Sequence, residues 1–207
     1  WEHKNFKAVF ENFQKELAPE FSDEGIKLFY SLIVNVIIFH DYGKINPRFQ
    51  SIKMKNTLKK WAVIDCLEGT NHSMLSAAIY LDYFYEKIQE IPLSKDEKNI
   101  IHVFMLANAY VITRHHGNLS GFEAFLEEFQ QNRQLADIFS CMNQGVFTEV
   151  YHGPFCKKGL HSVNMPMQNK RKYDSFSEKQ SLQLGLYAYI RFLFSVLVSC
   201  DYYATSE

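Results

Sequence analysis

Apolar side chains recur at intervals of three and four residues along most of this chain, which is the spacing of one face of an α-helix. The first stripe runs from Phe6 to Leu17 and predicts an amphipathic helix over about residues 2–18. Only 9 Gly and 5 Pro occur among the 207 residues, so long helices are expected in place of many tight turns. The spacing therefore predicts an all-α fold.

A second helix is predicted to begin at Asp23, which can cap it, and its apolar stripe ends at His40. Gly43 and Pro47 then stop this helix. The stretch from Pro47 to Leu67 is interpreted as short helical pieces. His40 is thus expected at the C-terminal end of a helix.

The later helices are marked by the residues that begin them. Thr70 or Asn71 can cap a third helix that extends to about Ile91. A fourth helix carries His115 on its apolar face and ends at Gly117. Capping boxes open this fourth helix and two more, at Ser94–Glu97, Ser120–Glu123 and Ser177–Gln180.

Between residues 143 and 175 glycine and proline interrupt every helical period, and an irregular segment is expected there. The apolar stripe of the last helix follows this segment and ends on Asp201. No internal repeat and no linker divides the chain, so one domain over residues 1–207 is expected. The predicted architecture is a helical bundle with one irregular insertion.

The net charge is −1 at pH 7, so the chain as a whole exerts no strong attraction on nucleic acid. Phosphate binding must then come from a local basic patch or from bound metal ions. Two basic runs could follow a phosphate backbone, although an ordinary solvated surface has the same composition. They are Lys53, Lys55, Lys59 and Lys60, followed later by Lys170, Arg171 and Lys172.

The cysteines and the apolar segments indicate in which cellular compartment the chain is expected. The 4 Cys show no CxxC pairing and are interpreted as free thiols in a reducing cytoplasm, not as a zinc site. The stretch from Leu182 to Cys200 is apolar but is interrupted by Gln183 and Arg191, which favours a core helix over a membrane span. With no signal-peptide pattern at the N-terminus, a cytoplasmic protein is expected.

Histidines gather at predicted helix ends, in the pairs His40-Asp41, Asn71-His72 and His115-His116. His3 falls on the first apolar stripe and Asp201 on the last. Imidazole and carboxylate suit first-row transition metals, and a carboxylate can bridge two ions. A single inward histidine is usually a hydrogen-bonded core residue, but several buried His and Asp without cationic partners are costly. Metal ions remove that cost for all of them, so a two-ion site is predicted.

Helical geometry decides which histidines of the fourth helix can take part. His115 follows Phe104 by eleven residues, close to three turns, and so lies over the apolar face. His102 falls on the opposite face by the same count and is excluded. His116 is rotated by ~100° from His115 on an ideal helix. Both can reach one site only where the helix ends, and Gly117 indicates that it ends there.

Four motifs follow one another along the chain: His40-Asp41 with Gly43-Lys44, Asn71-His72 with Ser76, His115-His116-Gly117, and Asp201 with Ala204-Thr205. In order and spacing they resemble the HD nuclease domain of the type I CRISPR nuclease-helicase. The resemblance covers almost the whole chain, and the paired histidines are its most discriminating element. It implies an HD-domain helical bundle, expected to be the N-terminal part of a longer nuclease-helicase.

The resemblance also implies a ligand set for two divalent metal ions. One ion would be held by His3, His40, Asp41 and Asp201, and the other by Asp41, His72, His115 and His116. Asp41 would bridge the two ions, and Lys44 would contact a substrate phosphate or support the site. The many imidazoles favour Mn, Co, Ni or Fe, with Mg also compatible.

The activity implied by the resemblance is endo- or exonucleolytic cleavage of single-stranded DNA in type I CRISPR interference. Its partners would be a helicase motor, fused or separate, and the RNA-guided surveillance complex. Two other functions are compatible with the residues. An HD phosphohydrolase acting on nucleotides or cyclic dinucleotides would use the same metal ligands around an enclosed pocket. A metal-stabilised docking module would use the fold without catalysis.

Overall fold

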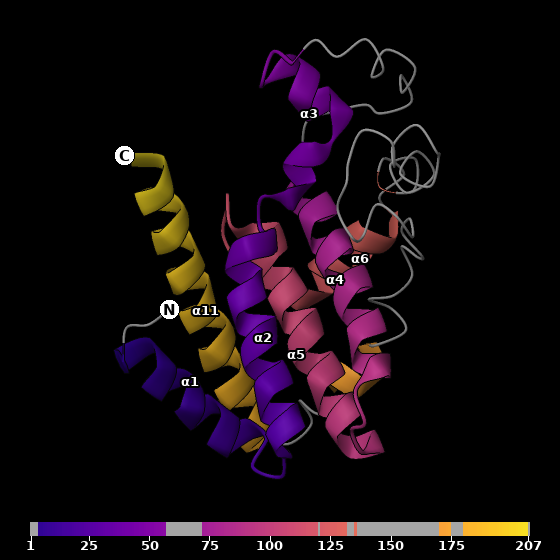
Figure 1. The fold of residues 1–207 in the computed structure, drawn as a ribbon, viewed down its shortest axis with the longest axis vertical. Helices are drawn as coiled ribbons and strands as arrows, with labels where there is room; N and C mark the ends of the chain where they lie inside the picture. Colours follow the sequence, from indigo (N-terminus) through magenta and orange to yellow (C-terminus); the bar gives the residue numbers. More distant parts are fainter. Residues whose placement is uncertain are drawn as a thin grey trace.

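The computed structural model describes residues 4–56, 72–119, 121–131, 135, 170–174 and 180–206. Within these ranges all regular structure is helical and no strand occurs, which confirms the all-α prediction. Figure 1 shows the long helices side by side, with α3 beyond one end of the bundle. The elements are α1 (Lys4–Leu17), α2 (Asp23–Phe39), the 3₁₀ turn η1 (Tyr42–Ile45), α3 (Pro47–Ile52), α4 (Ser73–Glu90), α5 (Lys95–Arg114), α6 (Phe122–Gln131) and α11 (Gln180–Ser206).

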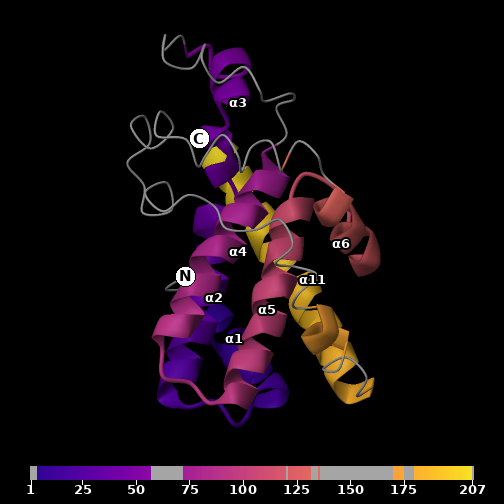
Figure 2. The ribbon, with the colours of Figure 1, turned by 90° about the vertical axis from the view of Figure 1, so that its right-hand side faces the viewer.

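The central element of the bundle is α5. It packs most extensively against α4 and α2, and α11 covers a further side (Figure 2). Every side chain from Ile101 to Ile112 is buried, so this helix is enclosed all round and not on one face alone. The ring of Phe104 lies between those of Phe29 on α2 and Tyr189 on α11, with centroids 4.9 and 5.1 Å away. Burial of this aromatic cluster holds α2, α5 and α11 together.

One carboxylate joins the starts of α2 and α5. The cap of α2 is Ser22 and not Asp23, because the Ser22 hydroxyl accepts the backbone N–H of Gly25. The predicted capping box at Ser94 and Glu97 is present. Glu97 also accepts the Ser22 backbone N–H at 2.7 Å and the Ser22 hydroxyl at 2.6 Å. Since the two helices are joined where they begin, they run together and end on the same side of the bundle.

The first helix is less deeply buried than expected. α1 lies against α11, where Phe10 is fully buried and its ring meets that of Phe192 at 5.3 Å. The expectation that Phe6 faces inward is wrong, since this side chain is 39% exposed. Phe6 lies one turn before Phe10, toward the start of α1, and still approaches Phe192 at 6.2 Å.

Several other expectations concern helix ends. α4 is capped by His72, one residue later than expected, and ends at Glu90. The candidate caps Thr70, Asn71, Ser120 and Ser177 lie outside the described residues. The prediction of an irregular segment over residues 143–175 is wrong near its C-terminal end, because residues 170–174 are helical. Within them, the ring of Tyr173 stacks on that of Phe122, with centroids 3.9 Å apart. Residues 143–169 and 175 lie outside the described part of the chain.

The last helix has one buried and one exposed face. Leu186, Leu193 and Leu197 are buried in the core, as predicted, whereas Leu184 is 71% and Tyr187 58% exposed. By length and composition alone, its segment Leu182–Ala204 could cross a membrane. Core helices of globular proteins often meet the same criterion, so this observation is weak evidence for a span.

Candidate metal centre

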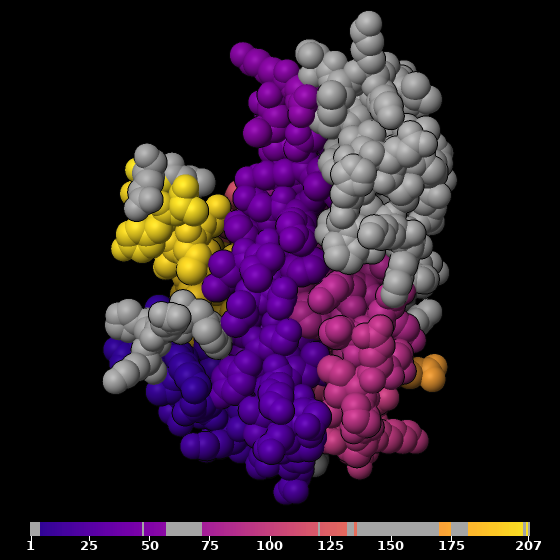
Figure 3. All heavy atoms as spheres, viewed as in Figure 1, coloured from indigo at the N-terminus to yellow at the C-terminus, as the bar shows by residue number. Residues whose placement is uncertain are grey.

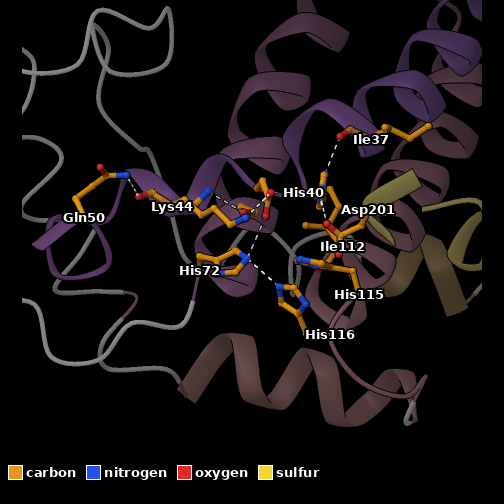
Figure 4. Close-up of polar contacts among 12 residues, drawn as sticks. Ile37, His40, Lys44, Gln50, His72, Ile112, His115, His116 and Asp201 are labelled. Atoms are coloured by element: carbon orange, nitrogen blue, oxygen red, sulfur yellow. Dashed lines mark hydrogen bonds and ion pairs between the residues drawn. The ribbon is translucent and has the colours of Figure 1, made fainter. Parts of the chain in front are cut away.

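Four helices bring the predicted ligands to one end of the bundle. α2 and α5 both run toward this end, α4 begins there, and α11 passes it near its C-terminus (Figure 1). In the close-up, His40, His72, His115, His116 and Asp201 gather in one place (Figure 4). In the space-filling view, α3 extends beyond this end (Figure 3).

His40 and His115 are held in the same way. His40 is the C-cap of α2, and its Nδ1 lies 2.7 Å from the carbonyl oxygen of Ile37, three residues earlier. His115 is the C-cap of α5, and its Nδ1 lies 2.6 Å from the carbonyl oxygen of Ile112. A carbonyl oxygen can only accept a hydrogen bond, so each ring carries its hydrogen on Nδ1 and turns a lone pair on Nε2 inward. This tautomer is the one required for metal ligation through Nε2.

His72 and His116 complete the histidine cluster. His72 is the N-cap of α4, and its Nε2 lies 3.1 Å from Nε2 of His116. The His116 ring also lies against that of His115, with centroids 3.9 Å apart. On the other side of His72, the ring of Phe49 from α3 makes an edge contact at 5.2 Å. Phe49 carried no sequence signal for this position.

Asp41 lies at the centre of the cluster. Its carboxylate oxygens lie 3.2 Å from Nε2 of His72, 3.5 Å from Nε2 of His40 and 2.6 Å from Nζ of Lys44. Burial raises the pKa of Asp41, but His72 and Lys44 outweigh burial and hold the pKa well below its usual range. The carboxylate of Asp41 is therefore ionised at neutral pH. Asp201 also approaches His40, at 3.5 Å, and its side chain is 21% exposed.

Two groups of ligand atoms could each hold a metal ion. The first contains Asp41, His72, His115 and His116, and the second contains His40, Asp41 and Asp201. Within each group the ligand atoms lie within 4.8 Å of one another. Asp41 belongs to both groups, so it is the residue that could bridge two ions.

The chemistry of these groups fits metal ions. Nε2 of His40 and Nε2 of His115 are buried without a hydrogen-bond partner in the described part of the chain, and the buried Oδ1 of Asp41 has Nε2 of His72 as a neighbour at 3.2 Å. Leaving such atoms unsatisfied is costly unless a cation binds them. Burial lowers the pKa of His115 to about 4 and also lowers that of His116, so both rings are neutral at pH 7, as a metal ligand must be. The C-terminal ends of α2 and α5 add partial negative charge.

The other predicted site residues differ in their exposure and in their partners. Lys44 contacts Asp41 and its side chain is 36% exposed. Lys53 and Lys55 are exposed just after α3. Lys170 forms ion pairs with Glu123 at 3.2 Å and Asp174 at 3.0 Å, so its charge is already balanced. Arg171 is exposed and Lys172 half-buried, while His3, Lys59 and Lys60 lie outside the described residues.

The exclusion of His102 agrees with the structure. Its ring is buried against Tyr85 with centroids 5.9 Å apart, and it belongs to neither ligand group. Burial lowers the pKa of His102 to about 4, so it is a neutral core histidine at pH 7. This residue shows that burial of an imidazole alone does not mark a ligand.

Comparison with known protein families adds one match. A sequence model of the family described as "Cas3, HD domain" matches residues 1–158. This range includes His40, Asp41, His72, His115 and His116 but ends before Asp201. The family match therefore does not bear on Asp201, which the structure places 3.5 Å from His40. No curated protein and no solved structure matches the chain significantly.

Proposed function

Because the chain belongs to the Cas3 HD-domain family of CRISPR-associated nucleases, we propose that it is a metal-dependent phosphodiesterase that cleaves single-stranded DNA in type I CRISPR interference. The observation that carries this proposal is the position of Asp41 in both ligand groups. A carboxylate shared in this way suits a pair of ions, and paired ions are the usual means of hydrolysing a phosphodiester without a protein nucleophile. Mn, Co, Ni or Fe, with Mg also compatible, are the ions that the ligand types favour.

The residues of this chain would hold the ions in two sets. Asp41, His72, His115 and His116 form the histidine-rich set, and His40, Asp41 and Asp201 the second, which His3 would extend. When bound, a pair of divalent ions supplies positive charge at the phosphorus and lowers the pKa of the attacking water. Burial keeps the imidazoles of His115 and His116 neutral, while His72 and Lys44 keep the shared carboxylate of Asp41 ionised.

Lys44 is proposed to act on the substrate. Its side chain is 36% exposed and its Nζ lies 2.6 Å from Asp41 Oδ2, so the ammonium group is at the edge of the ligand cluster. The amide of Gln50 donates to the backbone carbonyl of Lys44 at 2.6 Å and holds this turn. In this position a lysine can donate to a nonbridging phosphate oxygen and orient the scissile bond.

The proposed substrate and partners are those that membership of the family suggests. With a net charge of −1, the chain has no general affinity for DNA, so a helicase motor, fused or in trans, would deliver the strand. The RNA-guided surveillance complex in the cytoplasm would expose that strand. Exposed Lys53 and Lys55, with Lys59, Lys60 and Arg171, are proposed as weak backbone contacts, and Lys170 and Lys172 only as marginal ones.

The test compares substrates on one preparation of the chain treated with Mn²⁺. Single-stranded DNA circles and linear strands should be cut, and Asp41→Ala should remove cleavage while circular dichroism shows unchanged helix content. The same enzyme should leave deoxynucleoside triphosphates and cyclic dinucleotides intact. Hydrolysis of those small molecules without DNA cleavage would contradict the proposal in favour of a nucleotide phosphohydrolase. Wild-type protein without any hydrolytic activity, but with partner binding, would favour a docking module.

A further inference from the structure

The turn that follows Asp41 is fastened directly to the first turn of α4. The backbone N–H of Gly43 donates to the hydroxyl of Ser76 at 2.7 Å, and Ser76 is fully buried. The backbone N–H of Ser76 in turn donates to the carbonyl oxygen of His72 at 2.8 Å. A Cβ built on Gly43 would overlap that carbonyl oxygen and lie 2.8 Å from the backbone nitrogen of Ser76. Only glycine permits this backbone approach.

This contact connects two ligands that come from different elements. Asp41 lies two residues before Gly43, and His72 is the cap of the helix that Ser76 belongs to. The Asp41 carboxylate and Nε2 of His72 are 3.2 Å apart at this junction. Because η1 packs extensively against α4, a shift of one element would change this separation directly.

The second ligand group shares Asp41 with the first but has no ligand on α4, so it depends less on this junction. His40 is the last cap of α2 and Asp201 belongs to α11, and neither helix position is set by Ser76. Their 3.5 Å approach would survive a small displacement of α4. The histidine-rich group therefore depends on the junction more strongly than the group around His40.

We propose that Ser76, with Gly43, is a positioning residue that sets the geometry of the histidine-rich ion site. The proposal rests on the proposed function, since it concerns how that site binds its ion. Ser76 touches neither the ion nor the substrate and acts through the backbone of the turn after Asp41. Outer partners of this kind typically change metal affinity by about 10- to 100-fold.

A buried hydroxyl can also be purely structural, so the test needs a matched control. Tyr80 lies one turn after Ser76 on the same helix and is also fully buried. Its hydroxyl donates to the carbonyl oxygen of Leu32 at 3.1 Å, accepts from the side-chain amide of Asn108 at 3.0 Å and touches no ligand. Tyr80→Phe removes these two buried hydrogen bonds from the same helix without touching the turn.

The experiment measures Mn²⁺ binding to the full chain by calorimetry and thermal unfolding in chelator for Ser76→Ala and Tyr80→Phe. Ser76→Ala should weaken the histidine-rich site by about 10- to 100-fold and have a smaller effect on the other site, which shares Asp41 but has no ligand on α4. Tyr80→Phe should lower the melting temperature in chelator while both sites bind as in the wild type. Gly43→Ala is a stronger variant and should lose the histidine-rich site whenever it folds.

Two results overturn the proposal and differ from each other. Wild-type Mn²⁺ affinity at both sites in Ser76→Ala, together with a lowered melting temperature, would show that Ser76 is only structural and leave the proposed function standing. A wild-type chain that binds no divalent ion would overturn the proposed function and this inference with it.

Discussion

The imidazoles of His72 and His116 meet nitrogen to nitrogen, with their Nε2 atoms 3.1 Å apart. Two lone pairs repel at this distance, so a proton or a cation must lie between or beside them. Burial lowers the pKa of His116, which disfavours a proton on this ring at neutral pH. A common metal ion would satisfy both nitrogens.

His116→Ala should therefore lose one bound ion per chain and keep the other. The ion that is lost is the one of the histidine-rich group, since the second group does not include His116. Elemental analysis after loading with Mn²⁺ and desalting measures the number of ions. His102→Ala is the control, because it removes a buried histidine outside both groups and should keep the wild-type content. Equal loss in both variants would argue against specific ligation.

Substitution of the shared carboxylate should have a larger effect than substitution of an unshared one. Asp41→Asn removes a charge from both ligand groups and should abolish binding of both ions, whereas Asp201→Asn should affect the ion near His40 alone. The same elemental analysis measures the difference. If Asp201→Asn lost both ions and Asp41→Asn only one, the shared position of Asp41 would be wrong.

Lys44→Ala should separate catalysis from metal binding. Loss of a single positioned donor at a reacting phosphate typically lowers kcat on the order of 100-fold. Asp41 and the histidines remain, so the ion content should stay at the wild-type value. Single-turnover cleavage of a labelled DNA strand gives the rate, with Lys27→Ala, whose side chain is 77% exposed, as the control. A Lys44→Ala rate equal to that of the control would remove Lys44 from the mechanism.

Glu97→Gln should destabilise the bundle in a pH-dependent manner. Hydrogen bonds from Ser22, together with those from Ser94, lower the pKa of Glu97 from 4.5 to about 2. The carboxylate thus stabilises the folded chain fully above pH 4.5, and this stabilisation is lost as the pH falls toward 2. At pH 7 the variant should lose about 1–3 kcal/mol.

Urea unfolding of Glu97→Gln at pH 7 and at acidic pH checks this prediction. The difference from the wild type should shrink at acidic pH, because the wild-type carboxyl becomes protonated there. Glu24→Gln is the control, since its side chain is 52% exposed on the first turn of α2. A difference that grew on acidification would reverse the expected sign.

The fold was predictable wherever local spacing decides the structure. The period that places His115 three turns after Phe104, and the glycine that ends the helix, required only helical geometry. The capping box at Ser94 is likewise a local pattern. The family match then agrees with the resemblance drawn from these motifs.

Other features depend on contacts between distant segments and carry no local signal. Glu97 accepts a hydrogen bond from Ser22, which lies 75 positions earlier in the sequence, and Ser22 caps α2 in place of Asp23. Phe6 belongs to an apolar stripe yet remains exposed. The edge contact of Phe49 on His72 depends on the position of α3. The site could be predicted as a set of ligands, but not the neighbours that orient them.

The candidate centre takes ligands from both the first and the last long helix that surround α5. His40 is added early during synthesis, whereas Asp201 lies in the final turns of α11. A growing chain would thus carry an unfinished ion site until Tyr189 of its last helix has packed against Phe104 of α5. Under the proposed function, hydrolysis would therefore require the completed bundle, and nascent or truncated copies would lack it.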